Sequence, residues 1–396
     1  MTVNNTIVRP SGDTGIYIHI PFCTQKCNYC GFLSGPATAK EQDAYINALV
    51  REIGLVADLP FTGGEWRTSP RIDSVFIGGG TPSLLDASDI GRILAAVRAR
   101  YDVAEDAEIT IEANPASLTA DKLSGYRAAG VNRLSMGVQS FDDNVLRILG
   151  RIHTAEDAVR DFALARDAGF DNINLDLMFG IPGTDVNGTM ASLRQAVSLG
   201  PEHISYYGLQ LEEGTRFWAD FQAGRLNEIP EETDREMYHR GRMYLKDQGY
   251  VHYEISNFAK PGFQSRHNSK YWGMADYYGF GLGASSYIRG TRVVNTGDMA
   301  DYLRLVSAGR LPQADVYVNT ERDDIAEAVF TGLRRNFGIR FEDILGSKEQ
   351  FYDYYKSIIP RLEDFERSGH LLLTDEGITL TNLGIDVSNQ IMALFV

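Results

Sequence analysis

Strand-like and helix-like segments alternate through the first half of this chain. Six short runs are rich in apolar, β-branched and aromatic residues with little polar alternation, which is typical of strands buried on both faces. The runs cover residues 16–22, 72–77, 109–112, 133–138, 172–179 and 203–209. Strands that alternate with helices predict a parallel sheet with right-handed crossovers. Because six units are too few for a closed eight-stranded barrel, we expect an α/β fold, an open, partial (βα)6 TIM-like barrel over residues 15–215.

Segments with helical spacing of apolar residues connect the predicted strands. They cover residues 41–58, 89–101, 120–129, 142–167 and 189–199. Asp86, Thr119 and Asp142 precede three of these segments and are predicted N-caps. Gly130 follows the third segment and is predicted to end its helix in a left-handed conformation.

The alternation stops near residue 210, and a different module is expected from there. Residues 250–292 are polar, aromatic and glycine-rich, which predicts an elaborated loop with short strands. The other predicted elements are helices at 230–249, 298–308, 321–336 and 350–368, strands at 370–374 and 378–381, and a last helix at 384–395. Residues 216–396 therefore predict a smaller C-terminal α+β domain with a winged-helix-like end, packed against the first domain.

The charge balance limits the partners of this chain. Lys and Arg number 38 against 53 Asp and Glu, giving a formal charge of −15, which repels nucleic-acid phosphates and anionic lipids. No run of about 18 apolar residues occurs. Residues 1–15 are polar and lack an apolar signal segment. The sequence therefore predicts a cytoplasmic protein with no transmembrane segment and no nucleic-acid partner.

Three cysteines form a C-x3-C-x2-C pattern directly after the first predicted strand. An odd number of cysteines within eight residues argues against a disulfide framework. Cys23, Cys27 and Cys30 can bind three irons of a 4Fe–4S cluster and leave the fourth iron open to another ligand. Two other interpretations remain open at this stage: a zinc site with His19 as fourth ligand, and three inert buried thiols.

Residues 17–23, Tyr-Ile-His-Ile-Pro-Phe-Cys, together with the cysteine pattern resemble the signature of radical S-adenosylmethionine (SAM) enzymes, in their coproporphyrinogen-dehydrogenase branch. The resemblance extends over nearly the whole chain. It implies that the amino and carboxylate groups of SAM chelate the open iron. It also implies an electron donor, because an electron from the cluster splits the sulfonium of SAM in that superfamily.

Polar and glycine positions stand at successive strand ends, where functional residues of parallel barrels collect. Taken singly, each is more typical of a turn, a cap or a packing residue. The resemblance implies that they bind SAM together and that one tyrosine, Tyr29, shields the cluster from water. The implied SAM-binding residues are Tyr17, Tyr29, Gly79, Gly80, Thr81, Glu112, Gln139, Arg151 and Asp176.

Two departures separate this chain from the oxygen-independent coproporphyrinogen dehydrogenases. Those enzymes carry a further cysteine two residues after the third, where this chain has Phe32. They also have a longer N-terminal extension before the first strand. Both departures are shared with the HemW-type heme chaperones. An oxidoreductase similar to oxygen-independent coproporphyrinogen III oxidase remains the alternative.

A second motif favours the chaperones. Residues 266–272, Arg-His-Asn-Ser-Lys-Tyr-Trp, contain the His-Asn-x-x-Tyr-Trp sequence that is linked to heme binding in that family. An imidazole can ligate heme iron while aromatic rings cover the macrocycle, so His267 is the candidate heme ligand. Arg266 and Lys270 are candidates to pair with heme propionates. From chemistry alone, a role for His267 as a hydrogen-bonded packing residue is favoured over heme ligation.

The glycine-rich segment 277–287 does not follow the strand–helix pattern of a dinucleotide-binding fold, so a Rossmann site is excluded. Some related sequences place a histidine near position 285, where this chain has Ser285. The sequence as a whole favours a heme carrier that binds a 4Fe–4S cluster and SAM and hands heme to an acceptor protein. The resemblance includes membrane respiratory enzymes among such acceptors.

Overall fold

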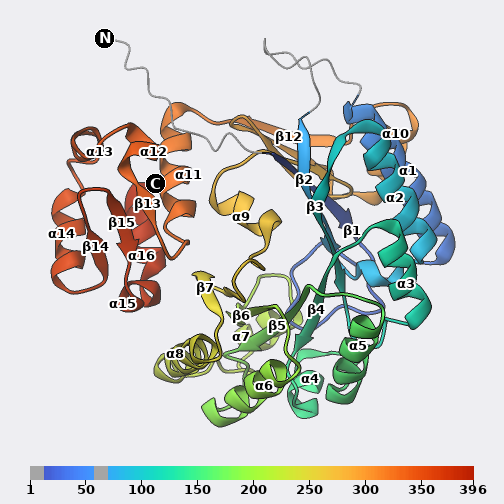
Figure 1. Ribbon diagram of the computed structural model, residues 1–396, viewed down its shortest axis with the longest axis horizontal. Coiled ribbons are helices and arrows are strands. Elements are labelled where there is room, and N and C mark those ends of the chain that lie inside the picture. The colour runs from blue at the N-terminus through green and yellow to red at the C-terminus, as the bar shows by residue number, and fades with distance from the viewer. Residues whose placement is uncertain (1–12, 58–69) are drawn as a thin grey trace.

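The computed structural model describes residues 13–57 and 70–396. Within these ranges, twelve strands form one mixed sheet in the order β12-β11-β10-β9-β1-β2-β3-β4-β5-β6-β8-β7 (Figure 1). Six neighbouring strands follow chain order and pair in parallel. They are β1 (Thr14–Ile20), β2 (Arg71–Gly79), β3 (Asp102–Ala113), β4 (Arg133–Gln139), β5 (Ile173–Phe179) and β6 (His203–Gly208). The predicted α/β fold with an open set of six parallel strands is therefore confirmed.

Crossover helices cover the outer side of the curved parallel sheet (Figure 1). They are α1 (Ala39–Ala57), the short 3-10 helix η1 (Pro82–Leu84), α2 (Ala87–Arg100), α3 (Ala120–Ala129), α4 (Asp143–Leu149), α5 (Ala155–Asp167) and α6 (Val186–Ser198). The predicted stretch 142–167 is two helices, because Gly150 ends the first in a left-handed conformation with φ of 74°. Residue 58, the predicted end of the first helix, lies outside the described ranges.

The three predicted N-cap positions are correct. The side chains of Thr119 and Asp142 accept hydrogen bonds from backbone N–H groups of the following helical turn. Gly130 ends α3 with φ of 100°, as predicted. Asp86 is the N-cap residue of α2, as predicted, but its side chain makes no capping hydrogen bond.

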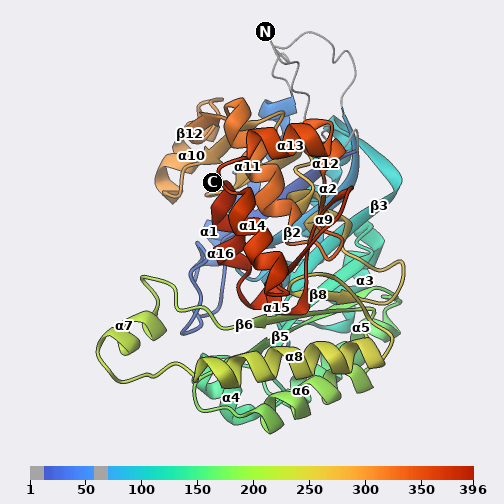
Figure 2. The same cartoon turned by 90° about the vertical axis from the view of Figure 1, so that its left-hand side faces the viewer.

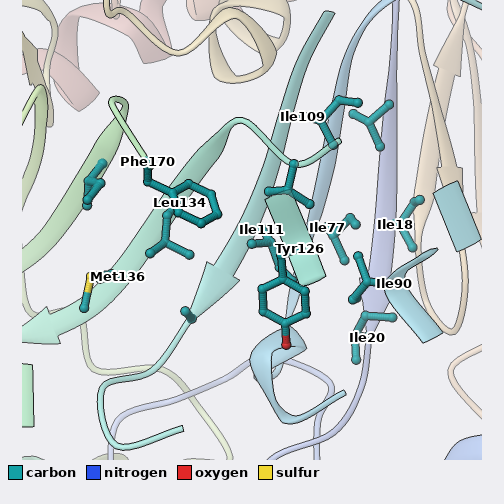
Figure 3. Packing of buried hydrophobic residues seen from close by; sticks show 14 of the residues in the cluster. Ile18, Ile20, Ile77, Ile90, Ile109, Ile111, Tyr126, Leu134, Met136 and Phe170 are labelled. Carbon is teal, nitrogen blue, oxygen red and sulfur yellow. The ribbon is translucent and has the colours of Figure 1, made fainter. Parts of the chain in front are cut away.

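The core lies between the parallel strands and these helices. Ile18, Ile77, Ile111 and Leu134 come from four successive strands, and none of their surface is exposed. Figure 3 shows the strand side chains in a layer, with Tyr126 of α3 packed beside them. Burial on both faces explains why these strands have almost no polar alternation.

The chain after β6 returns to both edges of the sheet. β7 (Val251–Glu254) and β8 (Asn257–Ala259) extend the edge at β6, and β9 (Tyr277–Phe280) pairs in parallel with β1. The other elements of this part are α7 (Arg216–Gln222), α8 (Glu231–Asp247), α9 (Arg266–Trp272), β10 (Ser285–Ile288), β11 (Thr291–Asn295), α10 (Met299–Ser307) and β12 (Gln313–Val318). Residues 251–318 therefore complete the sheet that the parallel strands begin.

The motif at 266–272 is a helix, whereas the sequence predicted a loop there. Ser265 caps α9 by accepting a hydrogen bond from the backbone N–H of Asn268, and Gly273 follows its last residue. The cap satisfies an N–H group that a short helix otherwise leaves unpaired.

The last part of the chain forms a smaller unit with its own hydrophobic core (Figure 2). Its elements are α11 (Glu321–Gly332), β13 (Ile339–Arg340), α12 (Phe341–Leu345), α13 (Lys348–Tyr354), α14 (Ile359–Arg367), β14 (Leu371–Leu373), β15 (Gly377–Leu380), α15 (Asn382–Asp386), α16 (Ser388–Met392) and the 3-10 helix η2 (Ala393–Phe395). β13 joins the predicted hairpin of β14 and β15 in one small sheet. The domain division between residues 215 and 216 stays a prediction. No helix in the described ranges has the length and apolar character needed to cross a bilayer.

Candidate functional site

A cavity of about 400 Å³ opens at the carboxyl ends of the parallel strands. Its volume lies in the range of roughly 300–1,000 Å³ that small-molecule sites occupy. Eleven of the residues that the sequence analysis singled out line it. They are Cys23, Cys27, Tyr29, Cys30, Gly79, Gly80, Thr81, Glu112, Gln139, Arg151 and Asp176. Two predicted site residues, Tyr17 and His267, are not part of the cavity lining.

The cysteine loop follows β1 and presents three free thiols to the cavity. The backbone N–H of Cys30 donates to the carbonyl of Cys27 at 3.2 Å, which folds the loop back on itself. Two side chains donate to sulfur: Thr81 Oγ1 lies 3.5 Å from Cys23 Sγ, and Arg151 Nη1 lies 3.6 Å from Cys27 Sγ. Donors placed on the sulfurs fit thiolate ligands of an iron–sulfur cluster, whose properties depend on such hydrogen bonds.

His19 is not available as a fourth zinc ligand. Its Nε2 donates to the carbonyl of Leu33 at 2.9 Å, and its Nδ1 accepts from the Tyr17 hydroxyl at 2.9 Å. Both ring nitrogens are therefore engaged. Within residues 13–57 and 70–396, no three His, Cys, Asp or Glu side chains converge closely enough to hold a single ion. Three thiolates that each bind a different iron of a cubane do not need such convergence.

The glycines after β2 allow the cysteine loop to approach this strand. Gly79 has φ of +113°, and a Cβ atom there would lie 2.5 Å from the ring of His19. A Cβ atom at Gly80 would lie 2.6 Å from the carbonyl oxygen of Phe22. The N–H of Gly80 donates to the carbonyl of Ile20 at the end of β1, at 2.8 Å, and the N–H of Thr81 donates to the carbonyl of Phe22, at 2.7 Å. These N–H groups therefore hold the start of the cysteine loop against β2, and the predicted role of Gly79, Gly80 and Thr81 in SAM binding stays a prediction.

Two carboxyl groups, Glu112 of β3 and Asp176 of β5, line the cavity. Glu112 Oε2 accepts from the N–H of Gly79 at 2.9 Å, and Asp176 Oδ1 accepts from Asn174 at 2.7 Å. Burial, together with the nearby charge of Asp176, raises the pKa of Glu112 to about 8. Burial also raises the pKa of Asp176. Two carboxyl groups that are partly removed from water favour a cationic ligand, because its positive charge stabilises their ionised forms.

Arg151 joins the cysteine loop to the strand ends. Besides Cys27, its guanidinium donates to Asn114 Oδ1 at 2.7 Å and to the carbonyl of Gly137. Asn114 in turn donates to Thr81 Oγ1 at 2.9 Å. The sequence analysis missed Asn114, although its place two residues after Glu112, in Glu-Ala-Asn-Pro, is a signal that could have found it.

Gln139 and Tyr207 close another wall. Gln139 has φ of 68°, a left-handed conformation that is strained for a residue with a side chain. This conformation directs its side chain to Tyr207, whose hydroxyl donates to Gln139 Oε1 at 2.8 Å. Tyr207 was not predicted, and its position near the end of β6 is its only sequence signal. Tyr29 also lines this region, where burial raises its pKa.

His267 of α9 faces the sheet and is 1% exposed. Its Nδ1 lies 3.1 Å from Ser74 Oγ, its Nε2 lies 2.9 Å from the Tyr271 hydroxyl, and its ring stacks on Phe76 with centroids 5.4 Å apart. Burial lowers its pKa to about 3. In this geometry neither nitrogen is free for a heme iron, so the interpretation as a hydrogen-bonded packing residue describes His267.

The motif's cations also face away from the cavity. Arg266 pairs with Asp106 at 3.3 Å, and Lys270 Nζ lies 2.7 Å from Asp73 Oδ1. Of the motif residues, Asn268 and Trp272 line the cavity.

This fold, with three cysteines at the strand-end cavity, defines a radical SAM protein. Residues 17–195 match the model of the radical SAM superfamily. The chain resembles the structure of coproporphyrinogen III oxidase (HemN) from Escherichia coli, a radical SAM enzyme, with a TM-score of 0.82 and 26% identity. The likeness covers 98% of this chain and 91% of that one.

Within this class, the chain belongs to the family of the heme chaperone HemW. It is 38% identical over 385 residues to the heme chaperone HemW of Bacillus subtilis, covering 96% of this chain and 98% of the relative. It is 33% identical to that of Lactococcus lactis, covering 96% of each chain. It is 41% identical over 271 residues to that of Escherichia coli, covering 68% of each.

Proposed function

We propose that this chain is a cytoplasmic heme chaperone that binds a 4Fe–4S cluster and SAM in the strand-end cavity, binds heme, and transfers it to an acceptor protein. The convergence of three thiols, two buried carboxyl groups and one guanidinium on one cavity carries the proposal. Similarity to HemW over 96% of the chain supports the heme part. When bound, the cluster and SAM supply one-electron chemistry that no protein side chain offers.

Each group has a role that its chemistry suggests. Cys23, Cys27 and Cys30 hold iron, and Arg151 orients Cys27 through its 3.6 Å contact with sulfur. Glu112 and Asp176 face the positive charge and the polar groups of SAM. Tyr29 limits the access of water to the cluster face.

An oxidoreductase similar to coproporphyrinogen III oxidase is the second candidate, and the likeness to HemN favours it. Phe32, which is 65% exposed, stands where the dehydrogenases carry their additional cysteine. This substitution favours the carrier. Both candidates require an electron donor if the cluster is to be reduced.

Anaerobic reconstitution with iron and sulfide, followed by hemin titration, tests the proposal. The native protein should take up iron and sulfide, show a cluster spin signal that SAM alters, and shift the hemin absorption band. Cys27→Ser should lose the cluster, whereas Thr24→Ala, at an exposed position in the same loop, should keep it. The released heme should appear in an added heme-free acceptor protein.

Incubation with coproporphyrinogen III, SAM and a reductant separates the two candidates. Decarboxylation of the porphyrinogen would support the oxidoreductase and contradict the carrier. A protein without iron after reconstitution would contradict both.

A further inference from the structure

The cavity wall also includes residues outside the predicted SAM-binding set. Glu254 at the end of β7, Asn257 of β8, Trp272 at the end of α9 and Arg334 just after α11 are among them. α11 contacts α9, so the last unit of the chain brings Arg334 to the cavity wall (Figure 1). We call these four residues the annex.

Arg334 is the cation of the annex. Its guanidinium carbon lies 4.4 Å from the centre of the Trp272 ring, which holds the planar group by a cation–π contact. Its side chain is 25% exposed and lines the cavity. Its Nε is buried and has no hydrogen-bond partner.

Glu254 forms an ion pair with Arg334 but no hydrogen bond. The distance from Arg334 Nη2 to Glu254 Oε2 is 3.7 Å, which is too long for a hydrogen bond. Glu254 Oε1 accepts from the N–H of Ser256 at 3.0 Å and from Asn257, whereas Oε2 has no partner. Trp272 Nε1 also has none. Arg334 Nε and Trp272 Nε1 are buried donors without an acceptor, and an anionic ligand at the cavity wall would supply one.

The other two cations that line the cavity, Arg151 and Lys26, are already engaged. Arg151 donates to Cys27, Asn114 and Gly137, and Lys26 donates to the carbonyl of Phe32. Arg266 and Lys270, which the sequence suggested for this purpose, pair with carboxylates on the far side of α9. Arg334 is therefore the cation that the structure offers to an anion at this wall.

We propose that Arg334, supported by Trp272, binds a propionate of heme. The guanidinium is planar and binds a carboxylate through two parallel hydrogen bonds, which a lysine cannot do. The carboxylate of SAM is assigned to the cluster end of the cavity, so the annex takes the carboxylate of another ligand. Phe32 also lines the cavity and offers an exposed ring to an apolar macrocycle. The assignment rests on the proposed heme-binding function.

Titrations with hemin and with hemin dimethyl ester, whose propionates are esterified, test the assignment on the reconstituted protein. Arg334→Gln should weaken hemin binding by about tenfold, as expected for the loss of a charge-assisted contact. It should leave binding of the ester within about twofold, because the ester has no charge to lose. Arg334→Lys should restore part of the hemin affinity. Arg266→Gln is the matched control and should change neither affinity.

Equal hemin affinity in the native protein and in Arg334→Gln would overturn the propionate assignment and leave the heme-carrier proposal intact. An equal loss for hemin and for the ester would do the same, because it would point to a structural effect. If the native protein bound no hemin, the proposed function itself would fail, and this assignment with it. SAM binding by each variant checks that the cavity is folded.

Discussion

Glu112→Gln should stabilise the ligand-free protein at neutral pH while abolishing most SAM binding. Burial and Asp176 raise the pKa of Glu112 to about 8, whereas the ordinary value is 4.5. Between these two values the folded chain holds a proton that the unfolded chain releases. Stability therefore falls as pH rises through this window, because the folded state binds more protons.

The size of the effect follows from the shift. One pKa unit corresponds to about 1.4 kcal/mol, so at pH 7 the buried carboxyl group destabilises the fold by up to about 3 kcal/mol. Glutamine keeps an oxygen that accepts from the N–H of Gly79, and it has no proton to lose. SAM brings a positive charge to this site, so its affinity should rise with pH toward about 8 as Glu112 ionises. The variant should lose this pH dependence and about 100-fold in affinity, since the charge pair is removed.

Urea unfolding at several pH values between 5 and 8 measures the stability, and calorimetric titration measures SAM binding. Glu52→Gln is the matched control. The pKa of Glu52 is raised to about 7 by burial, but Glu52 bonds Tyr302, Asn295 and the N–H of Gly281 away from the cavity. This control should keep SAM binding. The reasoning would be refuted if the free energy of unfolding depended on pH in the same way in the native protein and in Glu112→Gln. An equal loss of SAM affinity in Glu112→Gln and Glu52→Gln would refute it as well.

Three further substitutions test the fold around the site. Gly281→Ala should destabilise the protein by more than about 2 kcal/mol, because φ is +102° and the added Cβ would lie 2.4 Å from the Tyr45 hydroxyl; an unchanged melting temperature would contradict this. His267→Ala should cost about 2 kcal/mol, since it leaves two hydroxyl groups without their imidazole partner. The hemin spectrum of its folded fraction should stay unchanged, and a lost iron ligand would instead alter that spectrum. Leu134→Ala should cost about 3 kcal/mol in urea unfolding and leave SAM binding intact, because Leu134 is fully buried in the core.

The sequence predicted the cavity well because strand ends determine it. Parallel strands place their carboxyl ends at one edge, so residues after successive strands meet whatever the details of the helices between them. Glu112 and Asp176 are 64 positions apart in the chain numbering, yet the charge of Asp176 helps to raise the pKa of Glu112 in the cavity. The cysteine loop was equally predictable, because it follows the first strand directly.

The start of a strand was less predictable where the strand begins with charged residues. β3 begins at Asp102, seven positions before the predicted start, and three of its first five residues are exposed. Residues such as Glu105 and Asp106 lower the local strand propensity, but pairing with β2 extends the strand regardless. Tertiary pairing supplies free energy that a local pattern does not contain.

The roles of distant partners were not predictable from single positions. His267 is held by Ser74, 193 positions away, and by the ring of Phe76. Arg334 lies far along the chain, in the turn after α11 and in no motif, and the packing of α11 on α9 brings it to the cavity. A sequence motif identifies which side chains can bind a ligand. The direction in which those side chains point depends on tertiary contacts with residues far away in the sequence.

The spacing of the His-Asn-x-x-Tyr-Trp motif nonetheless contains its geometry. In a helix, residues four apart lie on the same face, so His267 pairs with Tyr271 and Asn268 with Trp272. The first pair is buried against the sheet, with 2.9 Å between His267 Nε2 and the Tyr271 hydroxyl. The second pair lines the cavity. One short helix thus uses one face to fix its position and the adjacent face to build the wall beside Arg334, so the motif can serve heme binding without its histidine touching iron.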